Sequence, residues 1–239
     1  MSGTKNPVTA RRGPSLNLIL TAVVVVVAAA VIGGILLVNR SSGANGAPDE
    51  RLVPANAHTL SRVEGGKVTL VEFLDYQCPA CAAYYANVTK KLEQDYQGRI
   101  TIVTRNFPLQ MHPLALPAAK AAEAAAKQGK YREMYHALYD GFQTWAVNGR
   151  STSTDAAAAT AKFEEYAKDI GLDVEKFRAD SASPDVQAVI DRDLADGQAL
   201  GVSSTPTFFL NGEKFTPSGD TYADVDRELR AKIDQALGG

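Results

Sequence analysis

The sequence predicts an α/β protein with a mixed central sheet and an inserted helical domain, preceded by one N-terminal transmembrane helix. Three observations support this prediction. A strand–helix–strand pattern is followed by an alanine-rich helical stretch and then by a hairpin and a final helix, and an uncharged apolar segment precedes them all. The chain has 239 residues, of which 45% are hydrophobic and 22% charged. This composition is ordinary for a folded protein and excludes a wholly disordered or collagen-like chain.

Residues 18–38 are apolar and carry no charge. A helix of this length crosses a hydrocarbon core of ~30 Å at ~1.5 Å per residue. A cleavable signal peptide is the alternative, but its apolar region would have roughly 7–15 residues and a small-residue cleavage site, which does not follow Val38. Basic residues precede the segment, so we expect residues 1–17 to form a cytoplasmic tail and 18–38 a single-pass cell-membrane anchor. The C-terminal domain then lies outside the cytoplasm, in an oxidising compartment.

Residues 39–57 are small and polar without apolar periodicity, which predicts a flexible linker. All 27 acidic residues of the chain lie after residue 40, so the part expected outside the cytoplasm is net acidic. This balance argues against a nucleic-acid partner.

The next domain is predicted to contain residues 58–111 and, after an insertion, residues 200–239. Residues 67–74 are nearly all apolar, which predicts a strand buried on both faces. A helix starting at Pro79 and a strand over 99–107 follow, and this crossover makes the two strands parallel. Near the C-terminus, Asn-Gly between two strand patterns predicts an antiparallel hairpin, and an amphipathic helix closes the chain.

Residues 112–199 are alanine-rich with helical periodicity, which predicts the inserted helical domain. Four helices are expected, over 113–128, 131–145, 155–170 and after a cap at Ser183. Its aromatic residues are expected to form the core of this domain, among them Tyr131, Tyr135, Tyr139 and Trp145.

The two cysteines of the chain, Cys78 and Cys81, stand three residues apart at the predicted helix start. This spacing lets them form a disulfide. Backbone N–H groups and the helix dipole would stabilise a Cys78 thiolate, and Cys81, one turn further, would be the resolving thiol. We expect a redox pair that needs no metal and no cofactor.

Three other interpretations of the cysteines are weaker. A zinc half-site would need two more ligands, and the histidines of the chain are His58, His112 and His136. A structural disulfide would stabilise little because the loop it closes is short. Two reduced core cysteines do not suit an oxidising compartment.

The predicted domain resembles the DsbA-like branch of the thioredoxin superfamily. Three segments carry the resemblance: VEFLDYQCPAC over 71–81, RNFPL with His-Pro over 105–113, and VSSTPTFFLNG over 202–212. The resemblance implies a thioredoxin fold interrupted by a helical domain. It also implies that Cys78 is the attacked sulfur and that Pro206 is cis and faces the cysteine pair. Thr205 would help to bind an extended substrate segment.

Glu72 stands in an otherwise apolar strand, where a carboxylate is costly unless it has a partner or a role. The resemblance suggests a buried acid near Cys81 that moves protons during exchange. The alternative is that Glu72 points to solvent. His112 is expected to pack at a helix start rather than to act in catalysis.

The expected function is that of an extracytoplasmic thiol–disulfide oxidoreductase, most simply a disulfide donor to cysteine-containing secreted or membrane proteins. The resemblance implies reoxidation by a quinone-linked membrane protein of the DsbB or vitamin K epoxide reductase-like kind. We expect a monomer. The alternatives are a disulfide reductase or isomerase, and a peptide-binding chaperone module that does not use its cysteines.

Overall fold

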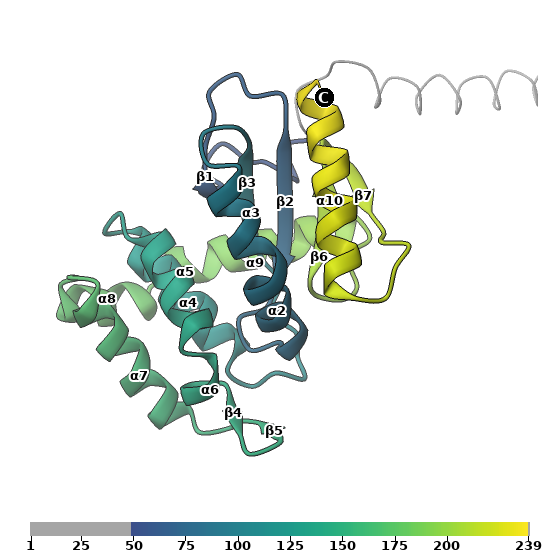
Figure 1. Ribbon diagram of the computed structural model, residues 1–239. Helices are drawn as coiled ribbons and strands as arrows, with labels where there is room; N and C mark the ends of the chain where they lie inside the picture. Colours follow the sequence, from purple (N-terminus) through teal and green to yellow (C-terminus); the bar gives the residue numbers. More distant parts are fainter. Residues whose placement is uncertain (1–48, 239) are drawn as a thin grey trace, which may run out of the picture. The chain divides into compact units, whose positions relative to one another are not determined.

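A five-stranded mixed sheet lies at the centre of residues 49–238, the part of the chain that the structure, a computed structural model, describes. Its strand order is β1-β3-β2-β6-β7 (Figure 1). The strands are β1 (His58–Ser61), β2 (Thr69–Leu74), β3 (Thr101–Asn106), β6 (Thr207–Leu210) and β7 (Glu213–Phe215). Strand β2 pairs in parallel with β3 and antiparallel with β6. The predicted mixed sheet is confirmed; β1, which pairs antiparallel with β3, was not predicted as a strand.

The hairpin between β6 and β7 forms at Asn211 and Gly212, as the sequence predicts. Both residues have positive φ angles, 51° and 88°, as a two-residue type I′ turn requires. The Asn211 side chain also accepts a hydrogen bond from the Thr69 N–H, at 2.8 Å. The hairpin is therefore tied to the start of the central strand.

Helices cover both faces of the sheet, with α3 and α10 in front and α9 behind in Figure 1. They are α2 (Pro79–Tyr84), the π-helical turn η1 (Tyr85–Thr89), α3 (Lys90–Asp95), α9 (Pro184–Ala199) and α10 (Tyr222–Leu237). Successive side chains of β2 point to opposite faces of the sheet. Leu70 and Leu74 pack with α2, η1 and α10, whereas Val71 and Phe73 pack with Leu194 of α9.

Helix α9 approaches the sheet closely because it carries glycine at the contact. A Cβ on Gly197 would lie 2.7 Å from the ring of Phe107, which follows β3. Any larger residue at position 197 would push the helix away from the sheet.

The helix predicted from Pro79 onward is not continuous. One π-helical turn, η1, separates α2 from α3. Such a turn inserts one residue into the helical register and changes which side chains face inward. Tyr85, Val88 and Thr89 are all buried here, and the Thr89 hydroxyl thereby reaches the central strand.

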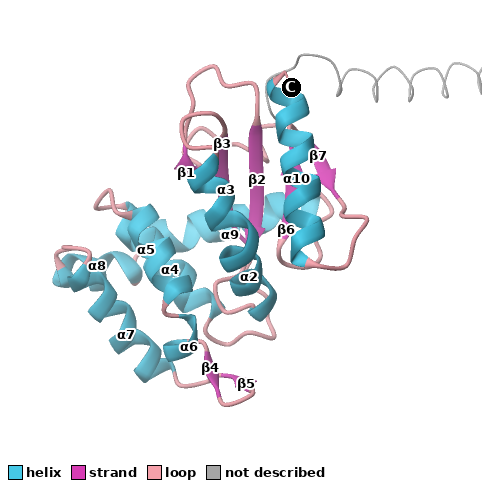
Figure 2. Ribbon diagram, in the orientation of Figure 1, coloured by secondary structure: helices cyan, strands magenta, loops and turns pink. Residues whose placement is uncertain are grey.

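The stretch between β3 and β6 is helical, as predicted (Figure 2). It contains α4 (Ala115–Ala126), α5 (Tyr131–Asp140), α6 (Phe142–Trp145), α7 (Ala156–Asp169) and α8 (Val174–Ser181), and leads into α9. The predicted cap of the last helix is confirmed, because the Ser183 hydroxyl accepts a hydrogen bond from the Val186 N–H.

Three features of this stretch differ from the prediction. The helix expected over 131–145 breaks at Gly141, where a Cβ would lie 2.0 Å from the Tyr166 hydroxyl of α7. Helix α8 was missed, although the Asp173 side chain caps it. A small hairpin, β4 (Val147–Asn148) with β5 (Ser151–Thr152), was also missed, because strands of two residues are too short to show alternation.

Residues 1–48, with the predicted tail, anchor and most of the predicted linker, lie outside the described residues. Within 49–238 no helix is long and apolar enough to cross a membrane. Ordered contacts begin before residue 58: Leu52 is buried, and its carbonyl accepts a hydrogen bond from Arg105 of β3.

Candidate active site

The two cysteines lie at the start of α2, directly after the central strand and a short turn. Cys78 is the N-cap residue, with φ −70° and ψ 120°, and Pro79 occupies the first helical position. The Cys78 N–H donates a hydrogen bond to the Asp75 carbonyl at 3.1 Å. Both cysteines are free thiols. Cys78 is 6% exposed and Cys81 is 0% exposed, so Cys78 is the more accessible of the two.

A proline loop lies opposite the cysteine pair. The Thr205–Pro206 peptide bond is cis, as the resemblance implies. The Cys78 Sγ lies 3.6 Å from the Thr205 carbonyl oxygen, to which the protonated thiol donates a hydrogen bond. The Thr205 hydroxyl is buried, and the Thr205 side chain helps to lower the pKa of Cys78. The fold therefore brings together Cys78, Thr205 and Pro206, which lie far apart in the sequence.

The two thiols have opposite electrostatic environments. A hydrogen bond from Cys81 is the main cause that lowers the pKa of Cys78 to about 6, and backbone N–H groups of the first turn add to it. Burial raises the pKa of Cys81 well above its ordinary value. The direction for Cys78 is the one expected from the sequence, but its largest cause is the neighbouring thiol. Near neutral pH, Cys78 is a thiolate and Cys81 a protonated thiol.

Glu72 of β2 is buried in the core. It is 1% exposed, which contradicts the alternative that it points to solvent. Its Oε2 accepts a hydrogen bond from the Thr89 hydroxyl at 3.1 Å, whereas Oε1 has no partner. Burial raises the pKa of Glu72 to about 8. The Glu72 charge contributes to the raised pKa of Cys81, so the two groups are electrostatically coupled.

His112 contacts the turn before the cysteines through Asp75. Asp75 was not singled out as a site residue from the sequence. Nδ1 of His112 lies 2.6 Å from Asp75 Oδ2. The Asp75 carboxylate also accepts hydrogen bonds from the N–H groups of Leu109 and Gln77, at 2.9 and 2.8 Å. Burial raises the pKa of Asp75. An acid within an otherwise apolar stretch was the available signal for Asp75, but its partners are distant in sequence.

Gln77, also missed, connects the same turn to the helical insertion. Its amide nitrogen donates to the carbonyls of Ala146 and Ser153, at 3.1 and 2.7 Å. Its Oε1 accepts the Leu114 N–H at 2.6 Å. The insertion therefore holds the backbone directly before Cys78.

The remaining histidines do not join the cysteines. His58 pairs with Glu123 at 2.8 Å, and His136 lies 3.2 Å from Glu93. Within residues 49–238, no group of three or more histidine, cysteine, aspartate or glutamate side chains is arranged to hold a metal ion.

A dithiol at the start of a helix, opposite a cis-proline and at the end of a central strand in this sheet, defines a thioredoxin-fold protein. Residues 64–231 match the thioredoxin family model, described as "Thioredoxin". The chain belongs to this family.

Solved structures agree with this fold. A thioredoxin-like oxidoreductase from Silicibacter pomeroyi DSS-3 is 28% identical, with a TM-score of 0.61, and the match covers 81% of this chain and 99% of that one. The thiol-disulfide exchange protein α-DsbA2 from Wolbachia pipientis is 24% identical, with a TM-score of 0.61 and coverages of 78% and 90%. BdbD from Bacillus subtilis is 20% identical, with a TM-score of 0.64 and coverages of 81% and 97%.

Curated relatives match over most of this chain but over a small part of their own length. The Na(+)/H(+) antiporter NhaA of Herminiimonas arsenicoxydans is 34% identical over 157 residues, which are 66% of this chain and 23% of that protein. The Na(+)/H(+) antiporter NhaA 1 of Mycolicibacterium gilvum is 32% identical over 181 residues, 74% of this chain and 27% of that protein. The chain spans about a quarter of the length of these relatives.

Proposed function

We propose that this chain is a protein-disulfide oxidoreductase that donates its Cys78–Cys81 disulfide to cysteine-containing secreted or membrane proteins outside the cytoplasm. The observation that carries the proposal is the opposite shift of the two thiols, with the pKa of Cys78 lowered to about 6 and that of Cys81 raised. A stabilised thiolate favours the reduced pair and makes the disulfide a better oxidant.

The reaction starts at the sulfur that a client can reach. A client thiolate attacks Cys78 Sγ of the disulfide, a client–Cys78 bond forms, and the Cys78–Cys81 bond breaks. The electron pair passes to Cys81 Sγ. The raised pKa of Cys81 means that this sulfur takes up a proton, and Glu72, whose pKa is raised to about 8, is the buried acid that can supply it.

A second client thiolate then attacks the client sulfur of the mixed disulfide. The Cys78 sulfur leaves with the electron pair, and its low pKa makes it a good leaving group. The client gains a disulfide and loses two electrons, and the cysteine pair of this chain is reduced. Thr205 and the cis Pro206, which lie beside Cys78, would hold the client segment there.

The site of action is also a proposal. The uncharged segment over 18–38 and the basic residues before it support a single-pass anchor with the C-terminal domain outside the cytoplasm. Such an anchor would keep the domain close to a quinone-linked membrane protein of the DsbB or vitamin K epoxide reductase-like kind, which would reoxidise it. We propose that it acts as a monomer.

The order of attack is tested by trapping. Cys81→Ala removes the internal thiol that can release a client, so mixed disulfides on Cys78 should accumulate and disappear on reduction. Cys78→Ala should trap none. Non-reducing gels after acid quenching measure both. Equal trapping by the two variants would refute the assigned roles.

Two further experiments distinguish the proposed donor from a chaperone module and from a reductase. A chaperone module would still bind unfolded client after both cysteines are replaced by alanine, whereas the proposed donor would lose its effect on client oxidation. A reductase would act on oxidised insulin but would not form disulfides in a reduced client. The donor is expected to oxidise the reduced client.

A further inference from the structure

Besides the Thr205 hydroxyl, two buried polar atoms near the active-site helix have no hydrogen-bond partner in the protein. They are Oε1 of Glu72 and the hydroxyl oxygen of Tyr135. Glu72 is 1% exposed and Tyr135 is 0% exposed. Buried polar atoms nearly always have a partner, in the protein or in ordered water. Each of these atoms therefore calls for one.

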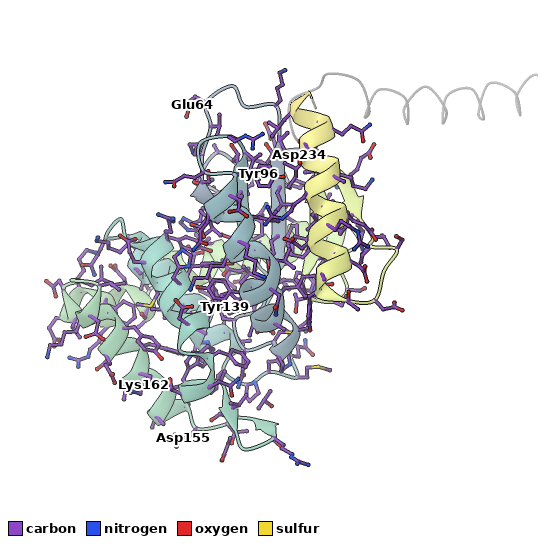
Figure 3. The ribbon with its side chains drawn as sticks, viewed as in Figure 1. Glu64, Tyr96, Tyr139, Asp155, Lys162 and Asp234 are labelled. Carbon is purple, nitrogen blue, oxygen red and sulfur yellow. The ribbon has the colours of Figure 1, made fainter. Side chains whose placement is uncertain are left out.

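Both side chains lie against the same two segments. Thr89 of η1 holds the other oxygen of Glu72, and the Tyr135 ring packs on Tyr85 of the same turn, at 5.6 Å between centroids. The Tyr135 ring also packs on Tyr76, which follows the strand of Glu72, at 6.1 Å. Tyr139, on the next turn of α5, lies between the insertion and the active-site helices in Figure 3. Tyr135 of the insertion and the Glu72 carboxyl therefore both contact η1 and the segment from β2 to Tyr76.

The electrostatics agree with this placement. Burial raises the pKa of Tyr135 well above its ordinary value, and the Glu72 carboxylate adds to this rise more than any other charge. The Tyr135 hydroxyl therefore keeps its proton across the whole working range of pH. The other titratable groups around these two side chains are Cys81, Tyr76, Tyr85, Glu93, Tyr131, His136 and Tyr139.

We propose that Tyr135 is a positioning residue for the Glu72 carboxyl, and that its hydroxyl and Glu72 Oε1 share one buried water molecule. A water between two polar groups of this kind satisfies both. The bridging water holds Glu72 Oε1 on the side away from Thr89. Its hydrogen bond to the carboxylate favours the ionised form of Glu72. This inference rests on the proposed function, because it has Tyr135 position Glu72, the group proposed to transfer a proton to Cys81.

The proton balance follows the disulfide step. When the Cys78–Cys81 bond opens, the electron pair lies on Cys81 Sγ, the proton of the Glu72 carboxyl moves to that sulfur, and an S–H bond forms. In the reverse step the Cys81 thiol gives its proton to the ionised Glu72 and attacks Cys78 of a mixed disulfide. Tyr135 stays neutral throughout and neither gains nor loses a proton.

The test uses the reduced full chain and Ellman's reagent, which reports the two cysteines separately. The first equivalent of thionitrobenzoate is released when Cys78 attacks the reagent, and the second when Cys81 attacks the resulting mixed disulfide. Tyr135→Phe keeps the ring and removes the hydroxyl. The second phase should become about 3- to 10-fold slower at pH 7, and its pH midpoint should rise by roughly half a unit to one unit. The first phase should not change.

The matched control is Tyr131→Phe, on the same helix. Its hydroxyl already bonds Tyr76 and Thr104, at 3.0 and 2.7 Å, so its loss should leave the midpoint of the second phase in place. In a Glu72→Gln background, Tyr135→Phe should have no further effect on that phase.

Two results would overturn the assignment of Tyr135. One is an unchanged second phase in Tyr135→Phe, and the other is an equal slowing in the presence and absence of Glu72. A wild-type chain that shows no second phase would instead contradict the proposed redox pair, so the two failures are distinguishable.

Discussion

Nδ1 of His112 donates a hydrogen bond to the Asp75 carboxylate at 2.6 Å, and the carbonyl of the same aspartate accepts the Cys78 N–H at 3.1 Å. One buried residue therefore connects the loop after β3 to the N-cap of the active-site helix. His112 lies three residues before α4 (Ala115–Ala126), and its side chain contacts the turn at Asp75. Asp75 makes more of these contacts than His112, because its carboxylate also accepts hydrogen bonds from two backbone N–H groups.

Asp75→Ala should reduce the free energy of unfolding by about 2–4 kcal/mol, because it leaves buried N–H groups of Leu109 and Gln77 without an acceptor. Urea unfolding of the oxidised protein measures this loss. Glu64→Ala, at an exposed position, should change stability by less than about 0.5 kcal/mol. Equal stabilities for the two variants would show that Asp75 does not hold the turn.

The thiolate of Cys78 should titrate with a midpoint near 6, because the Cys81 thiol donates a hydrogen bond to it. Cys81→Ala removes this donor and should move the midpoint up, whereas Cys81→Ser keeps a hydroxyl donor and should move it less. Ultraviolet absorbance of the thiolate, followed against pH in each variant, gives the midpoints. A wild-type midpoint near the ordinary thiol value would remove the basis for the proposed oxidant.

Glu72 should make the oxidised protein less stable as pH rises. Its pKa is raised from 4.5 to about 8 in the folded chain, so its contribution is fully present below pH 4.5 and is lost as pH rises toward 8. The slope is about 1.4 kcal/mol per pH unit over this window. Glu72→Gln should abolish it in urea unfolding curves of the oxidised protein. A slope that survives the substitution would assign the effect to another group.

The free energy of unfolding of the reduced protein should fall less steeply with pH, between pH 6 and 8, than that of the oxidised protein. Here the pKa of Cys78 is lowered from 9.0 to about 6, so the thiolate contributes stability that is present above pH 9 and is lost as pH falls through 6. This trend opposes that of Glu72. Comparison of unfolding curves for the two redox states checks the cancellation, and parallel pH profiles would contradict it.

Local patterns predicted much of the fold, and contacts distant in sequence account for most of what was missed. The parallel strand pair and the Asn211-Gly212 hairpin follow from short-range signals. The break at Gly141 coincides with a close approach to Tyr166 of α7, and the π turn buries Thr89. Neither contact leaves a pattern in the nearby sequence.

The site shows the same division. Cys78 and Cys81 form a local motif, whereas Pro206 was connected to them only through the family resemblance. The burial of Glu72 was left open by its strand pattern, because a strand has two faces. The hydrogen-bond partners of Asp75 could not be predicted from the sequence, because they depend on how the insertion packs against the sheet domain. The same holds for the buried, unpartnered hydroxyl of Tyr135.

The proposed anchor predicts the topology of the chain. A reporter that is active only outside the cytoplasm should be active when fused after Gly239, because residues 18–38 would cross the membrane with the basic tail inside. Added protease should degrade the C-terminal domain in intact spheroplasts. Protection of that domain from the protease would reverse the proposed orientation.

The equilibrium of the Cys78–Cys81 pair with a glutathione redox buffer tests the proposed donor most directly. Stabilisation of the Cys78 thiolate predicts an oxidising pair, with a reduction potential less negative than about −200 mV. Acid-quenched samples, alkylated and separated by mass, give the reduced fraction at each buffer ratio. A potential more negative than about −250 mV would contradict a donor and indicate a reductase.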